Sequence, residues 1–235
     1  MTGWSARRFW TAAAVVPGAG GFAVQLDGRP VRTPLKAPLV LPTEALAQAV
    51  AAEWQAGEGT VDPRRMPFTR ATNSAIDTVI PQFDAVVTML ADYGGSDLLC
   101  YRAEGPEALA ARQAAAWDPL LRWAVQAHDA PLVITRGVMH RSQPEASLAA
   151  LAAAVRGLSP FQLAAFHDLV ALSGSLVLAL AVARRRLTAD EAWTLSRIDE
   201  SWQIEEWGAD EEAAEIAALK QADFLQADRF FALCG

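Results

Sequence analysis

The sequence predicts an α+β fold, in which a small β-containing N-terminal domain precedes a larger all-helical domain. Two observations support this prediction: apolar residues alternate with a period of two in residues 1–42, and their spacing becomes helical from Thr43 onward. The chain has 235 residues, of which 52% are hydrophobic and 20% charged, so it is long and apolar enough to fold around a full core. We place the domain boundary near residue 80, which gives domains of residues 1–80 and 81–235. No change in composition marks this boundary.

The predicted strands lie between turn and proline signals. Phe22, Val24 and Leu26 alternate with more polar positions, which is typical of a half-buried strand. An Asp-Gly pair at residues 27–28 predicts a tight hairpin, with Val31 and Thr33 on the return strand. A further short strand is expected over residues 39–41. Prolines interrupt these segments and cannot donate to a ladder, so the sheet should be small and irregular.

Helical patterns fill the rest of the chain. Thr43 is a predicted N-cap, and Thr188 with Glu191 fits a capping box. Gly208 is expected to end a helix, and residues 131–139 to be extended. The predicted helices cover residues 43–54, 71–79, 83–90, 106–123, 144–157, 160–183, 189–206 and 211–233.

The most apolar stretch, Leu169–Ala183, is a candidate membrane segment. It is 15 residues long, and the polar pair His167 and Asp168 blocks its extension. A spanning helix needs about 20 apolar residues, so we expect a buried helix and no stable membrane insertion. The basic flank Arg184–Arg186 keeps a membrane-associated protein open as an alternative. The first residues carry no apolar leader, so we expect a bacterial cytoplasmic protein, or a mitochondrial matrix protein that has been processed.

Charge and cysteine content exclude several classes of protein. The net charge is −7, and no basic run is longer than three arginines, so nucleic acid is not an expected partner. Cys100 and Cys234 are too few for a disulfide framework or a thiolate metal site. Cys100 lies in an apolar context and is expected to be a buried, unreactive thiol. Asp97 and Arg102 beside it are candidates for a buried or interdomain ion pair.

The three histidines, His128, His140 and His167, show no metal-ligand spacing. His167 and Asp168 are adjacent and should point about 100° apart on a helix, so no local dyad is expected. The histidines therefore give no specific signal for a metal site or a catalytic site. A hydrolase-like enzyme that uses a His/Asp pair assembled between helices stays open as the alternative.

The stretch Ile198–Leu219 is unusual because it holds eight acidic residues and no basic one. A solvated helix face explains most of this charge. Trp202 and Trp207 are embedded in it, however, and tryptophan is enriched at protein interfaces. Such a surface would suit a basic, partly apolar partner.

Several segments in the same order resemble one family, the ATP12-type assembly chaperones of the ATP synthase catalytic-head alpha subunit. These segments cover nearly the whole chain and read RRFW, GGFAVQLDGRPVRTP, MPFTRATNSAID, DLLCYR, WDPLLRW and LTADEAWTLSRIDESWQIEEWG. After Glu211 the chain departs from many relatives, which continue with an aromatic residue and a His-Asp pair.

The resemblance implies two domains, no catalytic site and no obligatory cofactor, so we predict a protein that is not an enzyme and has no metal site. We also expect the free protein to be a monomer. It implies a chaperone that binds the unassembled alpha subunit and holds it assembly-competent until it pairs with beta. The family's sensitive acidic position falls on Asp199 or Glu200. The partner-binding residues expected on this basis are Asp199, Glu200, Trp202, Gln203, Trp207, Gly208 and Glu211.

Overall fold

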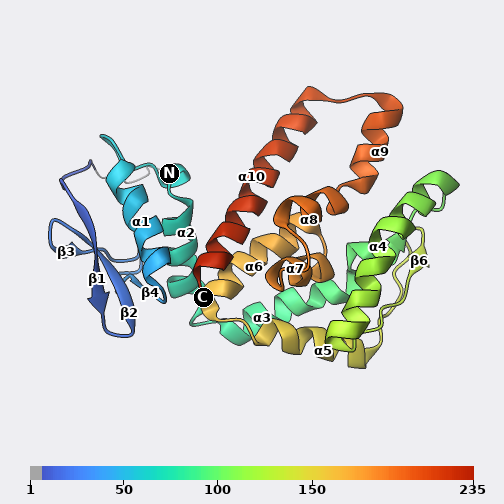
Figure 1. Ribbon diagram of the computed structural model, residues 1–235, viewed down its shortest axis with the longest axis horizontal. Coiled ribbons are helices and arrows are strands. Elements are labelled where there is room, and N and C mark those ends of the chain that lie inside the picture. The colour runs from blue at the N-terminus through green and yellow to red at the C-terminus, as the bar shows by residue number, and fades with distance from the viewer. Residues whose placement is uncertain (1–6) are drawn as a thin grey trace. The chain divides into compact units, whose positions relative to one another are not determined.

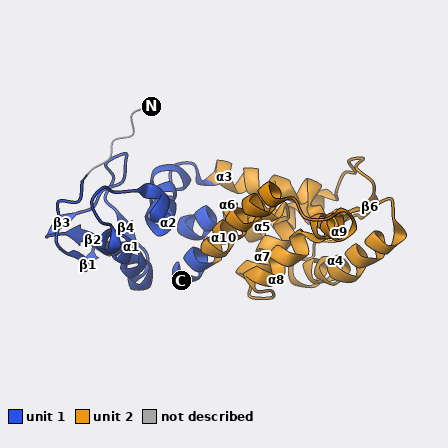
Figure 2. Ribbon diagram, turned by 90° about the horizontal axis from the view of Figure 1, so that it is seen from above, with its two compact units in different colours: residues 1–83, 159–165, 229–235 blue, residues 84–158, 166–228 orange. Residues whose placement is uncertain are grey.

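The computed structural model describes residues 7–235, and Trp4 lies outside this range. The chain forms two compact units (Figure 2). Unit 1 comprises residues 1–83, 159–165 and 229–235, and unit 2 comprises residues 84–158 and 166–228. The α+β class is confirmed (Figure 1). The division into domains at residue 80 stays a prediction.

Unit 1 contains the sheet and two of the helices. Its elements are β1 (Ala13–Gly18), β2 (Gly21–Leu26), β3 (Arg29–Pro30), β4 (Val40–Leu41), α1 (Glu44–Ala56) and α2 (Pro67–Ser74). β2 is the central strand, because β1, β3 and β4 each pair with it in antiparallel fashion. α1 packs on this sheet with Leu46, Ala47 and Val50 fully buried. The small, irregular sheet is therefore confirmed.

Local signals placed the hairpin between β2 and β3 and the first helix correctly. Asp27 and Gly28 both have positive φ, 47° and 81°, as the hairpin turn requires. The Thr43 hydroxyl accepts a hydrogen bond from Leu46 N at 3.2 Å, which confirms the predicted N-cap. The return strand is shorter than predicted. The chain turns just after β3 and pairs with itself through Arg32 and Pro38, so Thr33 lies in a turn and not on the return strand.

The predicted helix over residues 71–79 begins earlier, at Pro67 of α2. The carboxylate of Glu53, on α1, accepts hydrogen bonds from Phe68 N at 2.7 Å and Thr69 N at 2.8 Å. These are the free N–H groups of a helix start, so a residue distant in sequence caps α2. Burial raises the pKa of Glu53, and these hydrogen bonds oppose the rise. The helix continues into a π-helical turn over Ala75–Val79.

Unit 2 is helical around a central apolar helix. Its elements are α3 (Phe83–Ala91), β5 (Tyr101–Arg102), α4 (Glu107–His128), β6 (Thr135–Arg136), α5 (Glu145–Arg156), α7 (Leu176–Ala183), α8 (Ala189–Ser196) and α9 (Ile198–Trp207). Two further helices, α6 (Pro160–Ser173) and α10 (Glu211–Leu233), contribute residues to both units. The part predicted to be all-helical also holds one two-stranded parallel ladder, β5 with β6.

The apolar stretch Leu169–Ala183 contributes to the core of unit 2. Every residue from Leu176 to Val182 is buried, which confirms the interpretation as a core helix. Within residues 7–235, no helix combines the length and apolar character that a membrane span needs.

The single helix predicted over residues 160–183 is wrong, because the structure breaks it between α6 and α7. Gly174 adopts a φ of +70°, and its carbonyl accepts a hydrogen bond from Leu98 N at 3.1 Å. Ser175 then caps α7 by accepting from Leu178 N at 3.0 Å. The local signal, a glycine followed by a serine, was present in the sequence but was outweighed by the apolar run.

Asp97 fixes this break from another part of unit 2. Its fully buried carboxylate accepts from Leu99 N at 3.0 Å, Ser175 Oγ at 2.7 Å and Val177 N at 2.9 Å. Burial raises the pKa of Asp97, while these donors oppose the rise. The predicted ion pair between Asp97 and Arg102 is wrong, because Arg102 instead contacts Asp118 at 2.6 Å. Asp97 is bound by hydrogen-bond donors and needs no cation.

Both cysteines are buried, free thiols, as predicted for Cys100. Burial raises the pKa of Cys100 and of Cys234 to about 12. The thiolate is the reactive form, so its fraction at pH 8 falls about a thousandfold relative to an ordinary thiol. We expect neither cysteine to react with iodoacetamide within an hour in the folded protein, and both to react in 6 M guanidinium, as counted by intact mass. Rapid native labelling would contradict this burial.

Candidate functional site

The residues predicted to bind a partner lie on α9, on the loop that follows and at the first residue of α10. The capping box of α8 is confirmed, since the side chains of Thr188 and Glu191 each bind the other's backbone N–H. Gly208, at φ 89°, ends α9 as predicted. Figure 1 shows the chain leaving α8 through α9, turning in residues 208–210 and returning along α10.

The single helix predicted over residues 189–206 is wrong, because Arg197 interrupts it. The Leu195 carbonyl accepts a hydrogen bond from the Trp117 indole N–H at 2.9 Å. The Arg197 guanidinium donates to Leu172 O at 3.2 Å and lies 4.9 Å from the ring centre of Trp193. The two hydrogen bonds involve Trp117 of α4 and Leu172 of α6, so neighbouring helices help to determine where α8 ends and α9 begins.

A cavity of about 500 Å³ lies at the start of α9, and three predicted residues line it. They are Asp199, Glu200 and Gln203. The remaining wall is formed by Ser96, Leu98, Tyr101, Trp117, Ser173, Gly174, Ser196 and Arg197. The break between α6 and α7 therefore contributes directly to this cavity. We call it the α9 cavity.

The two acidic residues of the α9 cavity differ in their partners. Asp199 Oδ1 accepts a hydrogen bond from Gln113 Nε2 at 2.6 Å, and Gln113 is itself buried. Glu200 Oε1 pairs with Arg197 at 2.9 Å, and the Glu200 side chain is half exposed. Asp199 is thus half-buried and anchored to the buried Gln113, whereas Glu200 faces solvent.

Sequence reasoning missed the residues behind Asp199. Gln113 binds both Asp199 and the backbone N–H of Ala103, at 2.8 Å. Arg102 is buried, and its guanidinium lies 5.0 Å from the ring centre of Trp117. Burial lowers the pKa of Arg102, and the negative charge of Asp118 opposes this. No local pattern signals these roles, because each partner comes from a different helix or strand.

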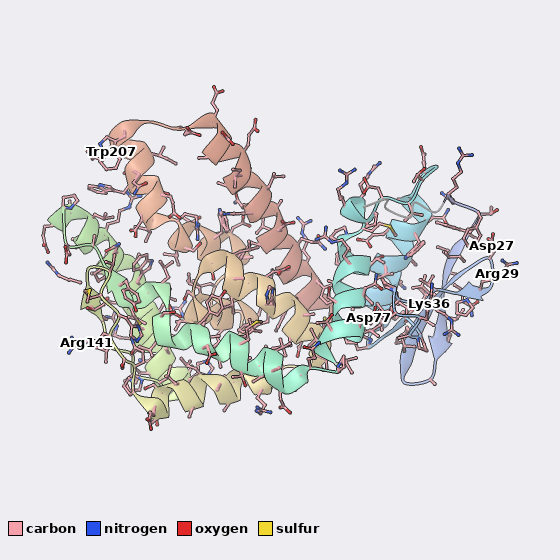
Figure 3. All side chains as sticks on the ribbon, turned by 180° about the vertical axis from the view of Figure 1, so that it is seen from behind. Asp27, Arg29, Lys36, Asp77, Arg141 and Trp207 are labelled. Carbon is pink, nitrogen blue, oxygen red and sulfur yellow. The ribbon has the colours of Figure 1, made fainter. Side chains whose placement is uncertain are left out.

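The second part of the candidate site is an exposed segment that we call the arm, residues 203–220. Every residue of the arm is exposed. It carries six acidic residues and one lysine, which gives a net charge of −5. Four large apolar side chains are also open to solvent: Ile204, Trp207, Ile216 and Leu219. Trp207 is 79% exposed, and Figure 3 places it at the surface end of α9.

The structure therefore divides the predicted residues into two groups. Asp199, Glu200 and Gln203 meet in the α9 cavity. Trp207, Gly208 and Glu211 lie in the arm, while Trp202 is half-buried on α9. Arg112 of α4 holds the arm in place by a bidentate pair with Glu205, at 2.6 and 2.9 Å.

The histidines do not form the pair expected of the enzyme alternative. His167 Nδ1 contacts the carboxylate of its neighbour Asp168 at 2.9 Å, so the prediction that these two side chains would not meet is wrong. Adjacent positions on a helix point about 100° apart, but both side chains turn toward each other far enough to make this contact. The pair is exposed on α6 and does not line the α9 cavity. Among the described residues, no cluster of three or more His, Cys, Asp or Glu side chains could hold a metal ion.

An exposed segment that is both acidic and apolar is typical of proteins that bind other proteins, and this α+β chain carries one. The family model for the ATP12 chaperone protein matches residues 7–125. The chain therefore belongs to the ATP12 chaperone family.

Relatives support this assignment over the full length. The chain is similar to the crystal structure of Atp12 from Paracoccus denitrificans, with 55% identity, a TM-score of 0.95 and coverage of 98% of this chain and 99% of the other. It is equally similar to an aspartate-to-lysine mutant of Atp12p from P. denitrificans, with 54% identity, a TM-score of 0.95 and 98% coverage of both chains. Protein atp12, mitochondrial, from Schizosaccharomyces pombe is 27% identical over 90% of this chain and 77% of that protein.

Proposed function

We propose that this chaperone serves ATP synthase assembly by binding the unassembled alpha subunit of the catalytic head until beta replaces it. The observation that carries the proposal is the arm, in which every residue is exposed and four of them are large and apolar. Membership of the ATP12 chaperone family supports the class of activity. The protein acts as a monomer, makes or breaks no covalent bond and requires no cofactor.

The physical basis is the shielding of an apolar surface. A subunit that awaits its partner exposes a patch of several hundred Å², which drives aggregation. A chaperone that binds the folded subunit stabilises it by mass action. The arm suits a reversible contact, because its tryptophan supplies an apolar anchor and its carboxylates supply attraction at a distance.

The bound state must also end when beta arrives. A contact made by one exposed segment and one cavity is smaller than a permanent subunit interface, so beta can displace it. The similar structures come from a bacterium, and the S. pombe relative is mitochondrial. We propose that this chain acts in the bacterial cytoplasm, or in the mitochondrial matrix if it is an organelle protein.

The replacement Glu200→Lys tests this proposal. Glu200 is half exposed and its ion pair with Arg197 is a surface one, so folding should lose under about 1 kcal/mol. Arg197 keeps its contacts with Leu172 and Trp193. We expect capture of purified alpha subunit to weaken about tenfold at 50 mM salt, because a cation replaces a carboxylate at the binding face.

Binding is measured by biolayer interferometry, and light scattering follows the aggregation of alpha. Glu58→Lys provides the matched control, since Glu58 is an exposed glutamate in unit 1. Equal capture by Glu200→Lys and wild type would remove the α9 cavity from the binding site. Failure of the wild-type protein to bind alpha, or to keep it from aggregating, would refute the proposed function.

A further inference from the structure

A short loop of unit 2 displays two apolar side chains that the proposed function does not use. The loop follows β6 and comprises residues 137–141, and we call it the apolar loop. Val138 is 94% exposed and Met139 is 78% exposed, so both are about as open to solvent as Trp207. Single exposed apolar residues are ordinary, but two adjacent ones at this level of exposure indicate a contact surface.

Val138 and Met139 do not belong to a loose chain end, because hydrogen bonds hold both sides of the apolar loop. β6 pairs with β5, and Gly137 N donates to Arg102 O at 2.9 Å. Gln143 is buried and closes the far side, where its amide group makes two hydrogen bonds with the backbone of Val133, at 2.6 and 3.0 Å. The turn also favours glycine, since Gly137 adopts a φ of +78°, a backbone conformation that other residues rarely adopt.

The apolar loop is continuous with the α9 cavity. His140 Nδ1 lies 3.4 Å from the hydroxyl of Tyr101, and Tyr101 lines the α9 cavity beside Asp199 and Glu200. The pairing of β5 with β6 enforces this neighbourhood, because β5 carries Tyr101 and β6 leads into the loop. One surface of unit 2 therefore runs from the α9 cavity through Tyr101 to Val138 and Met139.

The charges of the loop define the partner's chemistry. Arg136 is neutralised by Glu107, at 3.1 Å. Arg141 is exposed and forms no ion pair within residues 7–235, and Figure 3 shows it at the surface of unit 2. The surface that covers the loop should thus offer an apolar hollow beside an acidic group. The arm has the opposite sign and requires basic groups on its partner.

We propose that the apolar loop is a second contact for the same client, in which Val138 and Met139 enter an apolar hollow of the alpha subunit next to a carboxylate that faces Arg141. This inference rests on the proposed function, which supplies the client. Methionine suits such a contact, because its flexible thioether chain adapts to irregular apolar surfaces. Two contacts of opposite charge on one unit also fix the orientation of the client, which a single contact does not.

The test uses a double variant in which both Val138 and Met139 are replaced by serine. The control is Leu35→Ser, at a leucine of unit 1 that is 72% exposed. We expect the double variant to bind purified alpha subunit at least about tenfold more weakly, with an unchanged melting temperature, and the control to bind like wild type. If wild type binds alpha and the double variant binds it equally well, the loop is not a contact, while the proposed function stands. If wild type does not bind alpha, both fail.

A second measurement does not depend on weakened binding. The photo-reactive residue benzoylphenylalanine replaces Met139 in the full chain, or Leu35 as the control, and each protein is irradiated with purified alpha subunit. We expect a crosslink to alpha from position 139 and none from position 35. Absence of the crosslink at 139, under conditions in which wild type captures alpha, would overturn the inference.

Discussion

The replacement Asp97→Ala is expected to unfold unit 2 at temperatures that the wild-type protein tolerates. The carboxylate of Asp97 is fully buried and accepts three hydrogen bonds, from Leu99, Ser175 and Val177. Alanine leaves three buried donors without a partner, and each costs about 1–3 kcal/mol. We expect a loss of about 4 kcal/mol, a large share of a total stability of about 5–15 kcal/mol.

Thermal unfolding followed by circular dichroism checks this prediction, with an expected drop in melting temperature of about 10 °C. Asp84→Ala is the matched control, because Asp84 is exposed and pairs with Arg156 at the surface, so little stability depends on it. Asp97→Asn should fall between the two, since the amide keeps one acceptor oxygen. An Asp97→Ala protein as stable as the control would show that this carboxylate does not hold α7.

The second large effect is expected on binding and not on folding. Trp207→Ala removes the single aromatic side chain of the arm, which is 79% exposed. A tryptophan at the centre of a protein contact typically contributes 2 kcal/mol or more, so we expect alpha subunit to bind about thirtyfold more weakly. The melting temperature should stay within about 1 °C, because an exposed side chain contributes little to the core.

Binding of the Trp207→Ala protein is measured by titration against alpha at constant salt. Phe9→Ala serves as the control, since Phe9 is an aromatic residue of unit 1 that is 66% exposed. A matching loss in the Phe9→Ala protein would mean that general surface hydrophobicity drives the binding. Unchanged binding of Trp207→Ala would exclude the tip of α9 from the contact.

Local signals in the sequence predicted much of the fold. The cap at Thr43, the capping box at Thr188, the stop at Gly208 and the hairpin at Asp27 are all confirmed. Each depends on residues no more than four positions apart, so the residue types and their spacing are enough to predict it. The α+β class also followed from local periodicity, which changes where the strands give way to helices.

The helix breaks could not be located in this way. The ends of α6 and α8 depend on Asp97 and on Trp117, which lie 78 positions from their partners Ser175 and Leu195. The start of α2 depends on Glu53, 15 positions before Phe68. Apolar residues continue with helical spacing across the breaks at Gly174 and Arg197. A prediction from this spacing therefore gives one long helix where the structure has two.

The candidate site shows the same division. The acidic stretch with its tryptophans was visible in the sequence, and so was the resemblance to assembly chaperones. The sequence could not separate Asp199 from Glu200, because both are acidic neighbours on one helix. Tertiary structure distinguishes them: Asp199 is anchored by a hydrogen bond from Gln113, while Glu200 faces solvent beside Arg197.

The amino-acid sequence by itself determined the class of fold, the helix caps at Thr43 and Thr188, the hairpin at Asp27 and the chemical character of the arm. Only the tertiary structure decided where the long helices break, which acidic residue is anchored, and that the apolar loop adjoins the α9 cavity. The physical reason is the separation in sequence between the interacting groups. Caps and turns are satisfied by neighbours in sequence, whereas buried carboxylates, indole N–H groups and cavity walls are satisfied by partners that only folding brings within about 3 Å.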